Sequence, residues 1–391
     1  MKFDSQKHSA AHSQAVRTFL NMAPYPKSFA QPGEAFIYAP HSTSFQHLTD
    51  EEAKHFVEHG WLRVENAIDP DVIDRWMKDL WVRCGYDAGD KSTWIQGYLH
   101  LPFHRQLRYE HFAPKAFDKI TDIIGGVDAW DDERERWVGD NFVVNFGSES
   151  RSRELDNVKS PNKKGGWHCD NDWFRQFLDS SGTTLTVINC FTDVPAGGGG
   201  TLLCEDGLRE VCKRLYDHPE GLDPALTADD LTIGARECEI FQTVEAKKGD
   251  VFILHGLVPH TANYNYHHYA RVITNTHVTL KDQLHLDRPG KNYTLAEQVI
   301  LRALDRESIP EFKPTRERKF WYPRNFCFKE KRIEDELKAM KNAAAAEGLD
   351  ASKIDSIWLS EKARSNFART NGLLLPVHEE AGFETKQHSI Q

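Results

Sequence analysis

Two short stretches of the sequence contain the residue types of a mononuclear metal centre. His168 and Asp170 lie in GGWHCDND, and His260 lies in GDVFILHGLVPHTANYN. On an extended chain, side chains at positions i and i+2 point to the same side, so His168 and Asp170 can converge. A histidine from another strand would complete a set of two imidazoles and one carboxylate. This set suits ferrous iron and leaves three coordination positions of the metal open for a co-substrate and oxygen. The HxD tripeptide alone is a weak signal, because a histidine in a β-rich segment is more often a core or surface residue.

An arginine follows His260 at a spacing of eleven residues. Arg271 opens the β-branched run RVITNTHVTL, and a barrel strand there could carry its guanidinium inward. It would then pair with a carboxylate of a ligand that chelates the metal. A buried arginine needs a partner, and the run itself contains no carboxylate. The alternative is a surface arginine at the start of a strand.

Short β-rich runs separated by turn signals begin near residue 140. Such a series is typical of a sandwich or a jelly-roll barrel. Helices are predicted at 49–60, where Thr49 and Glu52 form a capping box, from Pro70 to just before Gly85, at 329–346 and at 353–372. A short strand is predicted at 61–65. The β-rich runs are 142–147, 183–192, 201–204, 239–244, 250–254 and 271–280.

These motifs, in their order, resemble the phytanoyl-CoA dioxygenase family of iron(II)/2-oxoglutarate oxygenases. LTDEEAKHFVEHGWLRVENAI (48–68) is similar to that family's first helix and strand, and WHCD (167–170) resembles its W-H-x-D metal motif. GDVFILHGLVPHTANYN (249–265) resembles the strand and turn of the distal histidine, with Asn265 at the matching place. The resemblance covers roughly residues 48–280.

The resemblance implies a mainly β fold with flanking helices around a double-stranded β-helix (jelly-roll or cupin-like) core. It implies that His168, Asp170 and His260 bind Fe(II) and that Arg271 anchors 2-oxoglutarate, which is converted to succinate while O2 oxidises a C–H bond of a second substrate. The intact Asp170 disfavours halogenation, because related halogenases have a small residue there. One departure is LLCEDG (202–207), which replaces the family's Pro-Gly-Ser-His stretch and puts acyl-CoA substrates in doubt.

Further residues are candidates for lining the site. One interpretation of Arg175 is that it pairs with a substrate carboxylate, although a salt bridge at the rim is the simpler interpretation. His255 competes with His260 as a ligand, but the spacing to Arg271 favours His260. We interpret His267, His268 and His277 as surface histidines, and AGGGGT (196–201) as a turn rather than a phosphate loop. The additional candidates are Asn145 and Gln96 for the cofactor, and Trp173, Phe174, Arg175 and Tyr98 for the substrate.

Composition restricts the partners and the compartment. The 391 residues include 49 basic and 59 acidic side chains, a net charge of −10, which argues against nucleic acid or an anionic membrane as the main partner. There is no signal-peptide pattern and no apolar run long enough for a membrane span. Seven cysteines without CxxC pairs indicate reduced thiols, so we expect a cytoplasmic monomer or homodimer.

The sequence therefore predicts an N-terminal arm (1–47), an oxygenase domain (48–294) and a helical C-terminal extension packed on the core (295–391). The predicted activity is oxidation of a C–H bond of a small organic molecule by hydroxylation, desaturation or oxidative cyclisation, in specialised-metabolite biosynthesis. The alternatives are a metal-dependent hydrolase that uses the same ligands and a non-catalytic ligand-binding barrel.

Overall fold

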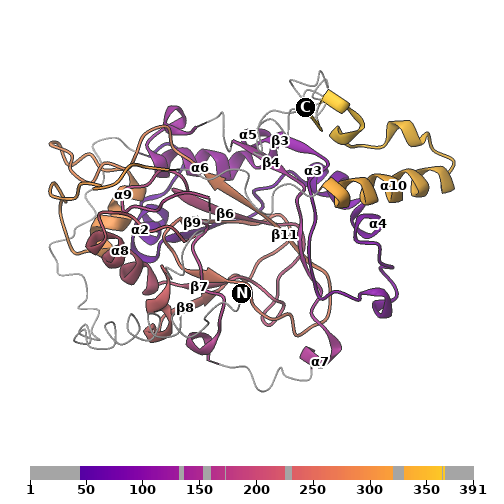
Figure 1. Cartoon of the computed structure of the whole chain (residues 1–391), viewed down its shortest axis with the longest axis horizontal. Coiled ribbons are helices and arrows are strands. Elements are labelled where there is room, and N and C mark those ends of the chain that lie inside the picture. Colours follow the sequence, from indigo (N-terminus) through magenta and orange to yellow (C-terminus); the bar gives the residue numbers. More distant parts are fainter. Residues whose placement is uncertain are drawn as a thin grey trace, which may run out of the picture. The chain divides into compact units, whose positions relative to one another are not determined.

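The structure is a computed structural model, and its described residues form part of one compact unit built on antiparallel sheets (Figure 1). It describes residues 45–131, 136–152, 160–171, 173–224, 231–319, 330–362 and 364–365. A six-stranded sheet has the order β1-β9-β6-β11-β5-β2, and the smaller sheets have the orders β10-β7-β8 and β3-β4. The strands are β1 (Trp61–Val64), β2 (Tyr98–His100), β3 (Gln106–Arg108), β4 (Trp137–Gly139), β5 (Val143–Asn145), β6 (Leu185–Cys190), β7 (Leu202–Cys204), β8 (Phe241–Thr243), β9 (Val251–His255), β10 (His260–Thr261) and β11 (Arg271–Val278).

The prediction of a mainly β core with flanking helices is confirmed. Each of the six predicted β-rich runs contains a strand, and the predicted strand at 61–65 is β1. The short strands β2, β3, β4 and β10 were not predicted, because two or three residues are too few to show a period. The predicted helix 329–346 is α10 (Glu330–Ala346). The predicted helix 353–372 is wrong in its first part, where the 3-10 turns η6 (Ala351–Lys353) and η7 (Ile357–Leu359) lie, whereas the described residues 361, 362, 364 and 365 are helical. Residues 366–372 lie outside the described chain.

The first two described helices begin at the predicted caps. Thr49 and Glu52 form the capping box of α2 (Asp50–His59), which ends at Gly60 with φ 75°. Asp69 caps α3 (Pro70–Met77). The prediction of one helix up to Gly85 is wrong, because α3 stops and α4 (Leu80–Cys84) follows after Asp79. The carboxylate of Asp79 pairs with Arg105, a contact that sequence periodicity does not reveal.

Alternation along the central strands divides the six-stranded sheet into two faces. One face packs against the helices: Trp76 of α3 stacks on Phe112 and Phe191, with ring centroids 5.2 and 6.0 Å away. Tyr109 donates a 2.9 Å hydrogen bond to Asn189 of β6 on the same face. The opposite face carries the side chains of alternate β11 residues, which include Arg271 and His277.

The remaining helices join both ends of the described chain to this core. α9 contacts α2, α6 and α8, so residues after 294 pack on helices from three earlier parts of the chain. The domain boundary at residue 294 stays a prediction, and residues 1–44 of the predicted arm lie outside the described chain. None of the described helices has the length and hydropathy of a membrane span. The helices not yet given are α5 (Tyr109–Phe112), α6 (Pro114–Ile124), α7 (Glu149–Ser152), α8 (Gly207–Asp217) and α9 (Leu295–Ala303).

A buried cluster of charges attaches α10 to the core. Arg83 donates to Glu336 of α10 at 2.8 Å and to Asp140 at 2.9 Å, and both its side chain and that of Asp140 are fully buried. Arg105 donates to the same Asp140 oxygen at 2.8 Å. Burial by itself would raise the pKa of Asp140, but the two guanidinium groups hold it below its usual value. Each charge in the cluster therefore depends on its neighbours to remain in the interior.

Arg83→Met is expected to lower the free energy of unfolding by about 3–5 kcal/mol, since it leaves buried carboxylates without a counter-charge. Urea unfolding at neutral pH measures the loss. The matched control is Arg306→Met, whose pair with Glu311 (3.5 Å) is about half exposed, and it should change the stability little. Equal stabilities of Arg83→Met and the wild type would contradict this account of the cluster.

Candidate metal centre

Main-chain hydrogen bonds bring His168 and His260 together. The N–H of each residue donates to the carbonyl of the other, at 3.0 and 2.9 Å, and the ring centroids lie 4.5 Å apart. His260 belongs to β10, where it pairs with Leu203 of β7. The segment with the HxD motif is therefore attached directly to the strand that carries the second histidine.

Both imidazoles have one ring nitrogen engaged by the backbone. Nδ1 of His168 lies 2.8 Å from the carbonyl of Gly166, and Nδ1 of His260 lies 3.1 Å from that of Val258. If each Nδ1 donates its proton there, each Nε2 is left with a lone pair, which is the tautomer that metals bind. Nε2 of His260 is buried and has no hydrogen-bond partner among the described atoms.

Asp170 faces both Nε2 atoms. Its oxygens lie 3.7 Å from Nε2 of His168 and 3.4 Å from Nε2 of His260, and one ligand atom from each residue lies within 4.8 Å of the others. An octahedral ion with bonds of about 2.1 Å places adjacent ligand atoms about 3 Å apart, so small shifts would close the site. Burial would raise the pKa of Asp170, but His260 and His277 hold it well below the usual range, so the carboxylate is ionised.

His277 also reaches this centre, which corrects its interpretation as a surface histidine. Its Nε2 lies 3.2 Å from Asp170, its ring centroid lies 4.8 Å from that of Trp173, and its side chain is 11% exposed. A signal was present in the sequence. Positions 271 and 277 differ by an even number, so a strand that points Arg271 to one face points His277 to the same face.

Arg271 is buried at the start of β11, as the sequence predicted for an anchor rather than for a surface residue. It is 1% exposed, and its Nε and Nη1 have no hydrogen-bond partner among the described atoms. It pairs across the sheet with Asn145, and Asn145 pairs with Tyr98 on β2. The three side chains therefore share the face of the sheet that carries His277.

The other cofactor candidates have different surroundings. The side chain of Asn145 donates to the carbonyl of Asn263 at 3.0 Å and accepts from the N–H of Gly147 at 3.1 Å. Gly147 has φ 63°, and a Cβ there would lie 2.1 Å from the carbonyl oxygen of Asn265, so this turn needs glycine. Asn145 thus connects the turn at Gly147 to Asn263, in the segment that precedes Arg271. Gln96 is exposed. Their contact with a cofactor stays a prediction.

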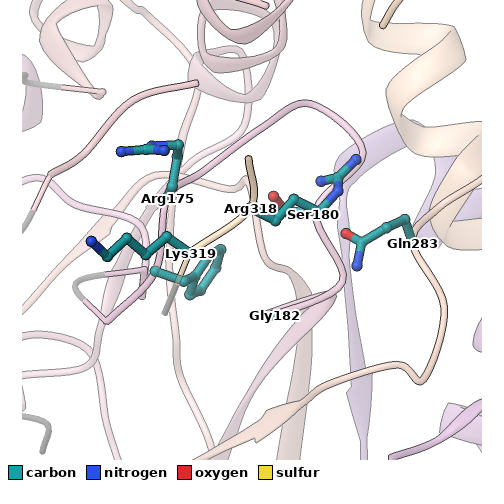
Figure 2. A pocket seen from close by; sticks show the side chains of 7 residues that line it. Arg175, Ser180, Gly182, Gln283, Arg318 and Lys319 are labelled. Atoms are coloured by element: carbon teal, nitrogen blue, oxygen red, sulfur yellow. The ribbon is translucent and has the colours of Figure 1, made fainter. Parts of the chain in front are cut away.

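Of the substrate candidates, Trp173 contacts His277, which faces Asp170. Tyr98 is 38% exposed. Arg175 is held by Asp223 through two hydrogen bonds of 2.7 and 3.1 Å, so the salt bridge weighed against a substrate role is present. Figure 2 shows that the guanidinium of Arg175 and the amine of Lys319 extend to the same side. A small pocket lies beside Arg175. Its lining residues are Phe174, Arg175, Ser180, Gly182, Gln283, Arg318 and Lys319. Their roles with substrate stay predictions.

His255 lies away from the centre, in agreement with the choice of His260. It is on β9 opposite Leu185, on the sheet face that packs against the helices. It is 1% exposed, and its Nδ1 accepts the N–H of Leu257 at 3.2 Å. Burial lowers its pKa to about 4, so the ring is neutral in the folded protein near pH 7.

Comparisons with known proteins give only weak similarities. No model of a known protein family matches the sequence, and no curated protein matches it. SnoN, a non-heme alpha-ketoglutarate-dependent epimerase from nogalamycin biosynthesis, is 14% identical over 59% of this chain and 79% of its own, with a TM-score of 0.32. HygX from Streptomyces hygroscopicus, solved with nickel, 2-oxoglutarate and hygromycin B, is 12% identical over 60% of this chain and 88% of its own, with a TM-score of 0.32. GIG2 (DUF1479) from Candida albicans is 13% identical over 78% and 84%, with a TM-score of 0.37. Because these TM-scores are low, the interpretation of the centre depends on its own distances.

The neutral His255 makes stability depend on pH. The pKa of His255 is near 6.5 in the unfolded chain and about 4 in the folded protein. Its contribution to the free energy of unfolding is therefore complete above pH 6.5. This contribution is lost as the pH falls toward 4, because the unfolded chain then binds a proton that the folded protein does not. His255→Asn, which keeps an acceptor for Leu257, should remove about 3 kcal/mol of this pH dependence. Urea unfolding of both proteins across that range measures it, and parallel pH profiles would contradict a buried neutral ring.

Proposed function

We propose that this protein is an iron(II)/2-oxoglutarate-dependent oxygenase with a double-stranded β-helix core, related to the phytanoyl-CoA dioxygenase family. The observation that carries the proposal is a pair of features: a cluster of metal-ligand side chains and a buried arginine on β11. Two histidines and an ionised aspartate converge, and β11 carries a buried arginine whose Nε and Nη1 have no hydrogen-bond partner in the described part of the chain. Neither feature alone would define this chemistry.

The donor set fits iron. His168, Asp170 and His260 provide two imidazoles, which bind metals in their neutral form, and one carboxylate, which is the set that non-heme iron oxygenases use. The backbone carbonyls at Nδ1 fix the orientation of both rings, and Asp170 contributes the negative charge that offsets part of the ion's charge. His277 and Thr186 contact the same oxygen of Asp170, at 3.2 and 3.3 Å, and limit its rotation.

The environment of Arg271 fits a dicarboxylate co-substrate. A buried guanidinium without a counter-ion is unfavourable, and a carboxylate that accepts two parallel hydrogen bonds satisfies it. We infer that Arg271 binds the distal carboxylate of 2-oxoglutarate while the keto acid end chelates the metal. Bound iron, 2-oxoglutarate and O2 together supply the oxidation, in which R–H, 2-oxoglutarate and O2 give R–OH, succinate and CO2 in the hydroxylation case.

The substrate in this proposal is a small organic molecule of specialised metabolism. It would enter beside Trp173, whose ring lies against His277. Desaturation and oxidative cyclisation would use the same centre with a different fate of the substrate. A hydrolase would use the three metal ligands without needing Arg271, so Arg271 distinguishes the two classes.

Arg271→Leu is expected to separate cofactor binding from metal binding. In an anaerobic titration with Fe(II) and then 2-oxoglutarate, the wild type should develop the visible metal-to-ligand charge-transfer band. Arg271→Leu should need about 100-fold more 2-oxoglutarate, since a buried charge pair is lost, while still binding iron. Without 2-oxoglutarate its thermal stability should not fall, because no carboxylate of the described residues pairs with the buried charge of the arginine.

Two controls accompany this titration. Arg306→Leu alters an exposed arginine and should leave the band unchanged. Asp170→Ala should abolish iron binding without unfolding the chain. Wild-type iron binding without a band, or a band that does not depend on Arg271, would overturn the assignment of 2-oxoglutarate.

His277→Phe is expected to weaken Fe(II) binding about 10- to 100-fold, because residues that orient a metal ligand have effects of this size. Phenylalanine keeps the packing against Trp173 but cannot contact Asp170. Equilibrium dialysis with Fe(II) under anaerobic conditions gives the affinity. The exposed His111→Phe serves as the control, and equal affinities of His277→Phe and wild type would show that His277 does not support the ligand.

A further inference from the structure

The loop LLCEDG, which departs from the family pattern, brings a second set of ligand atoms together. Cys204 ends β7, Asp206 directly precedes α8, and Cys238 follows the 3-10 turn η5 (Ile233–Glu237). One ligand atom from each lies within 4.8 Å of the other two. We propose that Cys204, Asp206 and Cys238 form a second metal site, which takes a thiophilic divalent ion such as zinc.

The distances suit tetrahedral coordination. Sγ of Cys204 lies 3.6 Å from Oδ1 of Asp206. A tetrahedral zinc ion with bonds of about 2.3 Å to sulfur and about 2.0 Å to oxygen separates those atoms by about 3.5 Å. The two sulfurs are buried, whereas Asp206 is half-buried, so the fourth position can be filled by water from the side of the carboxylate.

The backbone holds the ligands in this arrangement. The carboxylate of Asp206 accepts hydrogen bonds from the N–H groups of Glu239 at 2.7 Å and Ile240 at 3.2 Å, the two residues after Cys238. This fixes Asp206 relative to Cys238 across a sequence gap of more than thirty residues. Gly207 begins α8, and a Cβ there would lie 2.7 Å from Sγ of Cys204, so only glycine lets the chain turn so close to the sulfur.

The Cys204 thiol must lose its proton before it can bind a metal. A hydrogen bond with Cys238 and burial both raise the pKa of Cys204 above its ordinary value. Metal binding at this site must therefore release protons, and its affinity must increase as the pH rises. A soft ion that deprotonates the thiols outright is the kind of ligand this cluster selects.

The proposed second site contacts the residues that directly precede both histidines of the candidate iron centre. The N–H of Cys204 donates to the carbonyl of Pro259 at 2.9 Å, next to His260. Trp167, next to His168, packs on the cluster formed by Cys204, Ala235 and Cys238. A metal at this position would brace both segments that carry the histidines, and its role would be structural.

Cadmium provides a selective probe of this site, because thiolate-to-cadmium charge transfer absorbs in the ultraviolet and the His168–Asp170–His260 centre contains no sulfur. The experiment uses the full-length chain, reduced and stripped of metal with a chelator, and titrated with CdCl2. The wild type should develop the band with one thiolate-bound cadmium per chain. Cys204→Ser and Cys238→Ser should each lose at least half of it, and Asp206→Asn should weaken binding more than about tenfold.

The control is Cys212→Ser, which removes a buried thiol of α8 outside the cluster and should keep the full band. Circular dichroism of each variant identifies loss of fold, and Asp206→Asn keeps both thiols if a cysteine variant fails to fold. Zinc should raise the melting temperature of wild type and of His168→Ala alike, which makes this result independent of the iron centre. The proposal is overturned if the reduced wild type shows no band, if both serine variants keep it, or if Asp206→Asn binds as tightly as wild type.

Discussion

The pair of main-chain hydrogen bonds between His168 and His260 is the contact on which the candidate centre depends. It connects a segment outside the regular sheets to β10, and β10 is joined to β7. Asp170 then lies between this pair and His277 on β11 of the larger sheet. One carboxylate therefore links the two sheets, and it remains charged in the interior because imidazoles surround it.

The buried arginines of this protein fall into two kinds. Arg83 and Arg105 each contact Asp140, and Arg83 also contacts Glu336, so their charges are neutralised within the structure. Arg271 is equally buried, yet Nε and Nη1 lack partners among the described atoms. Stability alone does not explain such a residue, because an apolar side chain of similar size would cost less to bury. An anionic ligand does explain it, and this contrast is the strongest reason to assign a binding role to Arg271.

Local signals predicted much of this arrangement. Thr49, Gly60 and Asp69 act as caps at the predicted positions, and the β-branched runs became the strands that carry His260 and Arg271. What failed depends on contacts between distant residues. The break at Asp79 is associated with its pairing with Arg105. The role of His277 was overlooked because its cluster with neighbouring histidines was assessed by composition rather than by strand alternation.

The burial of the cysteines is compatible with the oxidising centre proposed for this protein. Thiolates, rather than thiols, are oxidised readily, and exposure increases the risk. All six cysteines in the described part of the chain are buried, and burial raises the pKa of Cys84 and Cys190 to about 12. Cys190 lies opposite Ile273 on β11, close to the face that carries Arg271, where a thiolate would also compete with a carboxylate for the guanidinium. Keeping that sulfur protonated leaves the guanidinium of Arg271 available to the carboxylate proposed as its ligand, so the burial that protects the thiol also suits the proposed binding role.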